Sequence, residues 1–108
     1  MKNVFHLSEL PTLDVPNDLF DVGFIHTDNI TVAFNDLKAG AIVPEHEHVH
    51  ETIDFVMEGT LEMVIAGEVH VMNAGTVARV PSNVRHGARA ITPCRVINIF
   101  YPKREDFK

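Results

Sequence analysis

The stretch Gly40–Gly59, GAIVPEHEHVHETIDFVMEG, places three of the seven histidines of this 108-residue chain within five residues. His46 and His48 stand two residues apart, and in an extended strand this spacing directs both imidazoles to one face. Neutral imidazole is the commonest protein ligand of divalent ions such as Zn²⁺, Fe²⁺, Ni²⁺ and Mn²⁺. The stretch therefore predicts part of a metal site, with at least one further ligand from elsewhere in the chain.

The best candidate for that ligand is His86, in the sequence GTVARVPSNVRHGARA. There a strand-like run ends at Pro81 and the chain turns back into another strand. Glycine and proline stand at fixed offsets from the histidines in both stretches. These residues are Gly40 and Gly59 around the first pair, and Gly75 and Pro81 before His86.

Both stretches resemble the two motifs of the cupin superfamily, small β-barrels that hold a metal near one end. The first motif is Gly, five residues, His-x-His, a carboxylate or amide ligand and a later Gly. The second is Gly, five residues, Pro, a short turn and His. The resemblance covers roughly residues 30–101. It implies an all-β fold, the cupin double-stranded β-helix or jelly-roll barrel, with one divalent metal held by His46, His48 and His86.

One position departs from the cupin pattern. The fourth ligand of the family comes four residues after the second histidine, and here that residue is Thr52. A neutral hydroxyl is a poor metal ligand, so a three-histidine site with open positions is the simplest interpretation. A bulge would allow His50 or Glu51 to replace it, and Asp54 shares the strand parity of Thr52. The sequence leaves the fourth ligand open, and also the choice among Zn, Ni, Fe and Mn.

Length and composition indicate a single domain over residues 1–108, with 45% hydrophobic and 22% charged residues. Residues 1–20 contain two prolines among acidic and apolar residues, which predicts a short N-terminal strand followed by an irregular arm. Residues 20–26 and 30–37 read as strands. From Gly59 onward, glycines separate short β-rich runs at a steady interval, as in antiparallel barrels.

The composition also limits the classes of binding partner and the cellular compartments that we expect for this protein. A net charge of −6 disfavours nucleic acid or an anionic membrane surface as a partner. No apolar run is long enough to span a membrane, and the single Cys94 cannot form an intrachain disulfide, which predicts a cytoplasmic protein. Apolar residues occupy both parities of residues 61–66 and 94–100. One face would fill the barrel and the other would pack on a second copy, so we expect a homodimer.

The C-terminal stretch VINIFYPKREDF, from Val96 to Phe107, resembles the end of the KdgF-type pectin-degradation family. That family ends in Asp-x-Phe-x-Pro-x-Arg-Glu-Asp-Phe and converts 4,5-unsaturated monouronates to their linear keto form. The resemblance implies a metal-dependent isomerase of pectin degradation, acting on a small sugar acid or similar carboxylate. The matching positions are Asn98, Phe100, Pro102, Arg104, Glu105, Asp106 and Phe107.

The same resemblance suggests roles for these side chains. The planar guanidinium of Arg104 suits a uronate carboxylate, and Phe100 can pack on a sugar face. The family's proton carrier is an Asp, and Asn98 stands in its place. Because an amide does not titrate, another group must carry the proton if the reaction is the same. The candidates nearest in sequence are His50, Glu51 and Asp54.

Two other functions remain open at this stage. Three histidines with free coordination positions on Fe²⁺ also suit a dioxygenase or a lyase. A non-catalytic cupin that binds a small carboxylate, as a sensor or carrier, would keep the pocket and Arg104 without turnover.

Overall fold

The computed structural model describes residues 2–108, and nearly all of its regular structure is β-strand. Strands over residues 20–26 and 30–37 are confirmed, the second beginning one residue later than expected. No helix in the described part of the chain has the length and apolar character needed to cross a membrane. The elements are the 3₁₀ turn η1 (Leu7–Glu9) and the strands β1 (Phe20–His26), β2 (Thr31–Leu37), β3 (Ile42–His46), β4 (Glu51–Glu58), β5 (Thr60–Ile65), β6 (Glu68–Asn73), β7 (Thr76–Val80), β8 (His86–Ala90) and β9 (Cys94–Tyr101).

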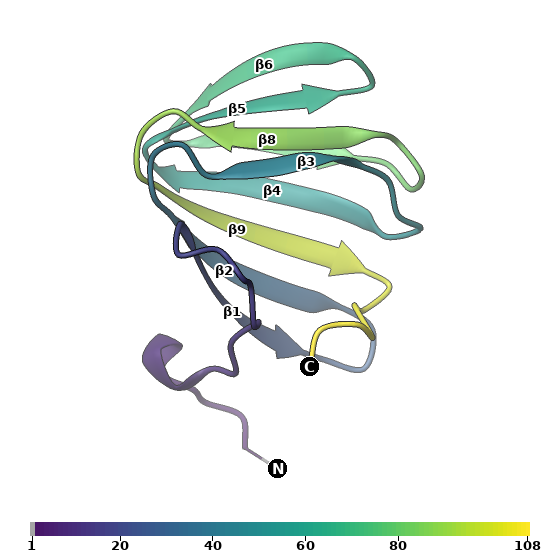
Figure 1. Cartoon of the computed structure of the whole chain (residues 1–108). Helices are drawn as coiled ribbons and strands as arrows, with labels where there is room; N and C mark the ends of the chain where they lie inside the picture. Colours follow the sequence, from purple (N-terminus) through teal and green to yellow (C-terminus); the bar gives the residue numbers. More distant parts are fainter. Residues whose placement is uncertain (1) are drawn as a thin grey trace.

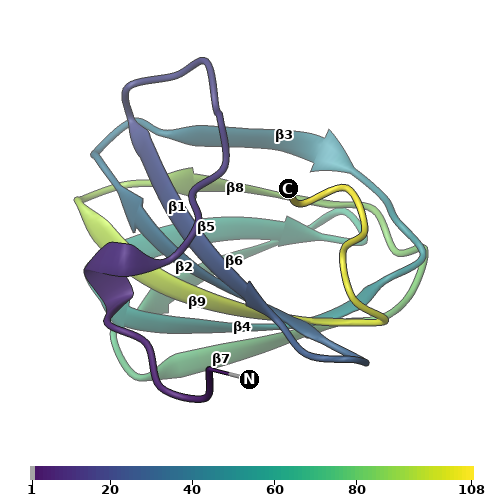
Figure 2. The same ribbon diagram turned by 90° about the horizontal axis from the view of Figure 1, so that it is seen from below.

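The strands form two antiparallel sheets that face each other (Figures 1 and 2). One sheet has five strands in the order β1-β2-β9-β4-β7, and the other has four in the order β3-β8-β5-β6. The last strand, β9, lies between β2 and β4 and pairs with both. The C-terminal strand therefore stands in the middle of the larger sheet. The predicted all-β barrel in a single domain is confirmed.

Buried and more exposed residues alternate along the strands of the larger sheet, most clearly on β4. On β4, Thr52, Asp54 and Val56 are buried, whereas the residues between them are more exposed. On β9 the inward positions are Val96, Asn98 and Phe100. Burial of apolar side chains supplies the main driving force for closing the two sheets on each other. The principal core cluster consists of Leu37, Ala41, Val56, Leu61, Met63, Met72, Ala78, Val80, Ala90, Cys94 and Val96.

The glycine spacing that predicts turns corresponds to real turns between strands. Gly59 lies between β4 and β5 with φ +84°, a left-handed conformation that side chains disfavour. A Cβ at this position would also collide with the carbonyl oxygen of Pro93. Gly59 is therefore required both by its backbone conformation and by its close approach to the loop before β9.

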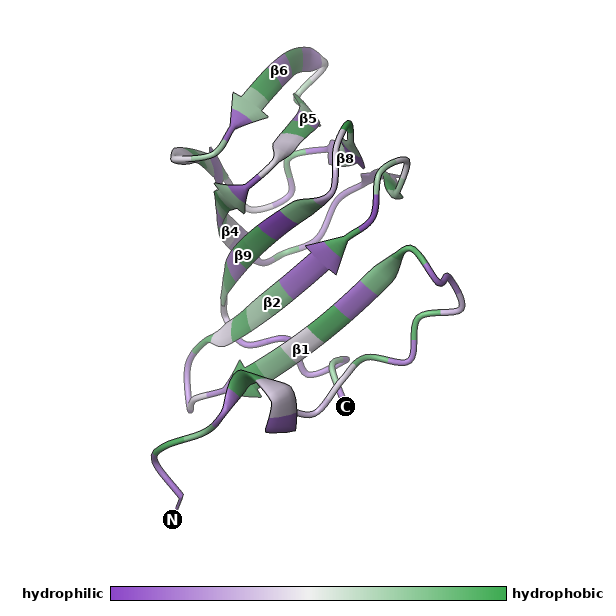
Figure 3. Ribbon diagram, turned by 90° about the vertical axis from the view of Figure 1, so that its left-hand side faces the viewer, coloured by the Kyte–Doolittle hydropathy of each residue, from purple (hydrophilic) through white to green (hydrophobic). Residues whose placement is uncertain are grey.

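The larger sheet also carries apolar residues on its outer face. Figure 3, which colours the ribbon by hydropathy, shows green segments along β1, β2 and β9. Ile99 of β9 stands beside Val32 on β2 and Ile53 on β4, and Ile97 stands beside Phe34 and Phe55 in the same way. These residues point away from the barrel interior. They form a continuous apolar band across three neighbouring strands, which we call the outer band: Val32, Phe34, Ile53, Phe55, Ile97 and Ile99.

The prediction of a short strand within residues 1–20 is wrong. Residues 2–19 contain only η1 and one isolated bridge between Thr12 and Gly23. The reason is local: Pro11 and Pro16 have no N–H to donate, so a continuous ladder beside β1 cannot form. The arm is held instead by two hydrogen bonds to β1, from Phe24 N to the Pro11 carbonyl and from Leu13 N to the Val22 carbonyl.

Candidate metal centre

Three histidines converge at one end of the barrel. His46 ends β3, His48 lies in the loop after it, and His86 begins β8 directly opposite His46 in the sheet. One ligand atom of each histidine lies within 4.8 Å of those of the other two. Within residues 2–108, no further His, Cys, Asp or Glu belongs to this cluster. The structure thus brings together the three predicted ligands, although they come from stretches about forty residues apart.

Each of the three rings is oriented by the main chain. Nδ1 of His46 donates to the Pro44 carbonyl (2.8 Å), Nδ1 of His48 to that of His50 (2.9 Å), and Nδ1 of His86 to that of Val84 (2.8 Å). A carbonyl oxygen can only accept, so each Nδ1 carries the proton. The Nε2 lone pairs are therefore free, which is the arrangement that metal-binding histidines use.

The electrostatics favour neutral rings. Burial is the main cause that lowers the pKa of both His48 and His86 below the usual value, and the positive charges of His46 and Arg104 act in the same direction. A metal competes with protons for the imidazole lone pair, so a lowered pKa leaves these ligands available at neutral pH.

Thr52 and Asp54 are the only two of the four proposed additional ligands that line the cavity beside the histidines, whereas His50 and Glu51 do not. The hydroxyl of Thr52 is buried and has no hydrogen-bond partner among the described residues. Such an orphaned hydroxyl suits a hydrogen bond to a water or substrate oxygen on a bound ion. Three neutral nitrogen ligands beside an unpaired hydroxyl fit a divalent metal with open coordination positions, although they do not identify it.

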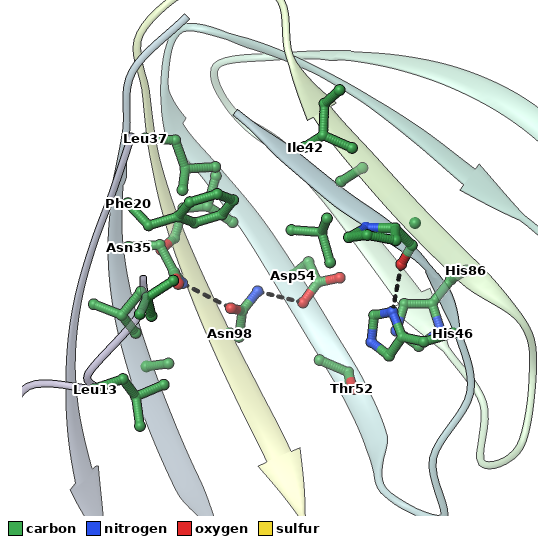
Figure 4. Close-up of a pocket in the computed structure, with 18 of the residues that line it drawn as sticks. Leu13, Phe20, Asn35, Leu37, Ile42, His46, Thr52, Asp54, His86 and Asn98 are labelled. Carbon is green, nitrogen blue, oxygen red and sulfur yellow. Dashed lines mark hydrogen bonds between the residues drawn. The ribbon is translucent and has the colours of Figure 1, made fainter. Parts of the chain in front are cut away.

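The cavity has a volume of about 560 Å³ and is lined by both polar and apolar side chains (Figure 4). Its polar lining includes the three histidines, Thr52, Arg104 and a row of hydrogen-bonded side chains described below. Most of the other lining residues are apolar, and some of them belong to the N-terminal arm. The apolar lining residues include Leu13, Val15, Phe20, Val22, Leu37, Ile42, Val43, Leu61, Met63 and Val96.

A row of three polar side chains crosses the larger sheet inside the barrel. Asn35 Nδ2 on β2 donates to Asn98 Oδ1 on β9 (2.7 Å), and Asn98 Nδ2 donates to Asp54 Oδ1 on β4 (2.6 Å) (Figure 4). Asp54 is 5% exposed. Its burial raises the pKa of its carboxyl to about 6, with the Asn98 hydrogen bond opposing this effect.

Arg104 reaches the cavity from the C-terminal segment, but one edge of its guanidinium is already engaged. Nε and Nη2 donate to the two carboxylate oxygens of Asp106 (3.0 and 2.8 Å), which lowers the pKa of Asp106. The guanidinium also lies 4.8 Å from the ring centre of Phe100 and 4.5 Å from that of Phe107. A substrate carboxylate would therefore meet the remaining N–H groups of Arg104.

A buried threonine anchors this segment. Thr31 Oγ1 accepts from the backbone N–H of Arg104 (2.8 Å) and bonds to Nδ1 of His26 (2.7 Å), whose Nε2 donates to the Phe107 carbonyl (3.0 Å). These contacts fix the end of the chain over the cavity. Sequence reasoning assigned no role to His26, because nothing near it in the sequence suggests a partner.

Comparison with known proteins agrees with this geometry. The cupin domain family matches residues 34–100. The chain belongs to the cupin family. Pectin degradation protein KdgF of Dickeya dadantii (strain 3937) is 32% identical to this cupin over 83 residues, which cover 75% of this chain and 76% of that protein.

Solved structures of cupins also resemble this chain. KdgF from Halomonas sp. superimposes on this cupin with a TM-score of 0.88 at 28% identity, covering 98% of each chain. An RmlC-like cupin from Shewanella frigidimarina superimposes with a TM-score of 0.89 at 24% identity, covering 98% of this chain and 96% of that one, and supports the fold alone. This cupin is KdgF-like, as its motifs predict.

Asn35 is a site residue that the sequence analysis missed. It occupies an inward position of β2, in the same parity as the buried Thr31, Ala33 and Leu37. A polar residue at an inward position of a predicted strand is the signal that could have drawn attention to it.

Proposed function

We propose that this cupin is a metal-dependent enzyme that opens and ketonises a small unsaturated sugar acid, such as a 4,5-unsaturated monouronate. The observation that carries the proposal is the convergence of three free imidazole nitrogens on a cavity that also holds a carboxyl group and a guanidinium. Its relatives include a protein named for pectin degradation, which supports the choice of substrate class.

The residues divide the task as follows. A divalent ion held by His46, His48 and His86 would supply Lewis acidity to the sugar oxygens. Arg104 binds the substrate carboxylate through the N–H groups that Asp106 leaves free, and Phe100 packs against the sugar ring. The apolar side chains that line the cavity lower its water content when substrate is bound, which strengthens the polar contacts. Ring opening and ketonisation rearrange bonds within one molecule, so no oxidant or second substrate is consumed.

The test is the near-ultraviolet absorbance of an unsaturated monouronate mixed with metal-loaded protein under anaerobic conditions. We expect the absorbance to fall in the presence of metal and to persist in a chelator-treated control. A protein that carries its metal and leaves the absorbance at the background rate would contradict this activity. Saturable binding of the uronate without turnover would instead favour a carrier or sensor.

The second candidate function is oxygen chemistry. It is favoured by the absence of a fourth His, Cys, Asp or Glu ligand within the described residues, which leaves positions open on a bound iron. Oxygen consumption by the iron-loaded protein with a small carboxylate, and none without it, would support a dioxygenase. Turnover that continues without oxygen would exclude this alternative.

We also propose that two copies associate through the outer band. The same face carries a groove lined by Leu7, Phe34, Met57 and Ile97, between the N-terminal arm and the sheet, which can receive the arm of a second copy. A cytoplasmic location agrees with Cys94, which is a free, buried thiol.

Sedimentation velocity tests this assembly. We expect a dimer for the native protein and a monomer for Ile53→Lys, since Ile53 is 40% exposed and a lysine there costs the single copy little. Val71→Lys, on the other sheet at a position 61% exposed, serves as the matched control and should remain dimeric. A native protein that sediments as a monomer at micromolar concentration would contradict the proposal.

A further inference from the structure

Asp54 is the one carboxyl-bearing residue that lines the cavity within residues 2–108. It lies on β4 directly opposite Asn98 on β9. In Figure 4 its side chain stands between Asn98 and the histidines, and one carboxyl oxygen points away from Asn98 toward the histidine side of the cavity. Among the residues that the structure describes, the only hydrogen bond of the carboxyl uses the other oxygen, Oδ1. Oδ2 is therefore free to exchange a proton with a bound molecule.

The neighbouring amides hold this carboxyl in place and cannot themselves exchange protons. Asn98 accepts from Asn35 through Oδ1 and donates to Asp54 through Nδ2. Asn35 also donates to the Val96 carbonyl (3.0 Å), which fixes its own orientation. Because the oxygen and the nitrogen of the Asn98 amide each form a hydrogen bond, the amide cannot flip without losing both bonds. The row thus fixes both the position and the direction of the Asp54 carboxyl.

We propose that Asp54 is the catalytic acid–base group that carries the proton in ketonisation, with Asn98 and Asn35 as positioning residues. This inference rests on the proposed function. The ring-opened substrate is an enol, with a hydroxyl on C5 and a double bond between C4 and C5. The Asp54 carboxyl gives its proton to C4 as the double-bond electron pair forms the new C–H bond. The C5 hydroxyl loses its proton as C5=O forms, and that proton returns the carboxylate to its acid form.

The environment suits this cycle. A carboxyl with a pKa of about 6 is present in both its acid and carboxylate forms near neutral pH, so it can both donate and accept. The other titratable or charged groups that line the cavity are His46 on β3, His48 after it, His86 on β8 and Arg104 in the C-terminal segment. None of these lies within salt-bridge distance of the Asp54 carboxylate. The row from Asn35 to Asp54 is thus separate from the metal ligands.

The decisive variant is Asp54→Asn, which keeps the shape of the side chain and an oxygen acceptor for Asn98. We expect kcat for the unsaturated uronate to fall by about 10²–10⁴-fold, with metal content and KM nearly unchanged. Asp21→Asn removes an exposed carboxylate from β1 and is the matched control. A metal-loaded Asp54→Asn protein with native kcat would overturn the proposal.

The positioning role has its own readout. Asn98→Ala removes the hydrogen bond that holds the pKa of Asp54 down. Because the carboxyl must be in its acid form to protonate C4, we expect the alkaline limb of the kcat–pH profile to move to higher pH, together with a loss of kcat. A lower kcat with an unmoved limb would indicate a purely structural effect and would overturn the role of Asn98.

A measurement without substrate separates this inference from the proposed function. In Zn²⁺-loaded protein, the ¹³C resonance of the Asp54 carboxyl, assigned by its absence in Asp54→Asn, is followed from pH 4 to pH 8. Titration within this range, shifted upward in Asn98→Ala, supports Asp54 as a proton carrier even where the native protein leaves the uronate unchanged and the proposed substrate fails. A carboxyl that stays ionised throughout would overturn the inference, whatever the substrate.

Discussion

Replacing His86 with alanine is expected to lower the affinity for the divalent metal by more than about 100-fold. Loss of a group that merely orients a ligand commonly costs about 10–100-fold, and His86→Ala removes a ligand itself. The two histidines that remain, His46 and His48, come from one end of β3 and the loop after it, so they would hold the ion from one side only. The measurement is the metal content of the desalted protein by mass spectrometry, followed by titration with a chelator.

The control for this experiment is His70→Ala. His70 is an exposed histidine on β6, in a different part of the sheet, and its loss removes an imidazole without touching the cluster. Its metal content should equal that of the native protein. Full occupancy in a folded His86→Ala variant would remove His86 from the ligand set and would also weaken the proposed Lewis-acid chemistry.

Asp54→Asn is expected to make the protein more stable at pH 8 while it removes activity. In the folded protein the pKa of Asp54 is raised from its usual 3.8 to about 6. Well below pH 3.8 both the folded and the unfolded chain hold the proton, so the group has no net effect. As the pH rises toward 6, the unfolded chain releases its proton first, and the free energy of unfolding falls. Above both values the loss is about 3 kcal/mol, and the asparagine variant does not incur it.

Thermal unfolding at several pH values measures this difference. The melting temperature of Asp54→Asn, relative to the native protein, should rise between pH 4 and pH 7 and then stay level, with a gain of more than about 10 °C. Metal-free samples of both proteins are compared, so that metal affinity does not enter. A difference that is constant with pH would show that Asp54 is ionised to the same extent in the folded and unfolded chain.

The strands and the histidine cluster were predictable because their signals are local. Alternation along residues 20–26, the turn glycines, and the spacing of His46 from His48 each depend on residues a few positions apart. His86 was within reach because glycine and proline mark its position in the second motif. In the folded chain, the pairing of β3 with β8 places His86 opposite His46.

The arrangement around Asp54 was not predictable in the same way. Sequence parity places Asp54 inside the barrel but leaves it one of several candidates, because the strands next to β4 are not fixed by local pattern. Only the pairing of β4 with β9, and of β9 with β2, places Asn98 beside Asp54 and brings in Asn35. The Asp106 contact of Arg104 depends likewise on the path of the last turn of the chain.

The oxygens that orient the three imidazoles belong to the peptide backbone, at Pro44, His50 and Val84. A point mutation can replace a side chain but cannot delete a peptide carbonyl. Mutations can therefore change β4 and β9, where Asp54 and Asn98 line the cavity, while the imidazoles keep their orientation. The orientation of the three imidazoles depends on the path of the backbone, whereas the chemistry of the rest of the cavity depends on individual side chains. Such a barrel can change the chemistry of its cavity in single mutational steps, without passing through an intermediate in which the histidine cluster is lost.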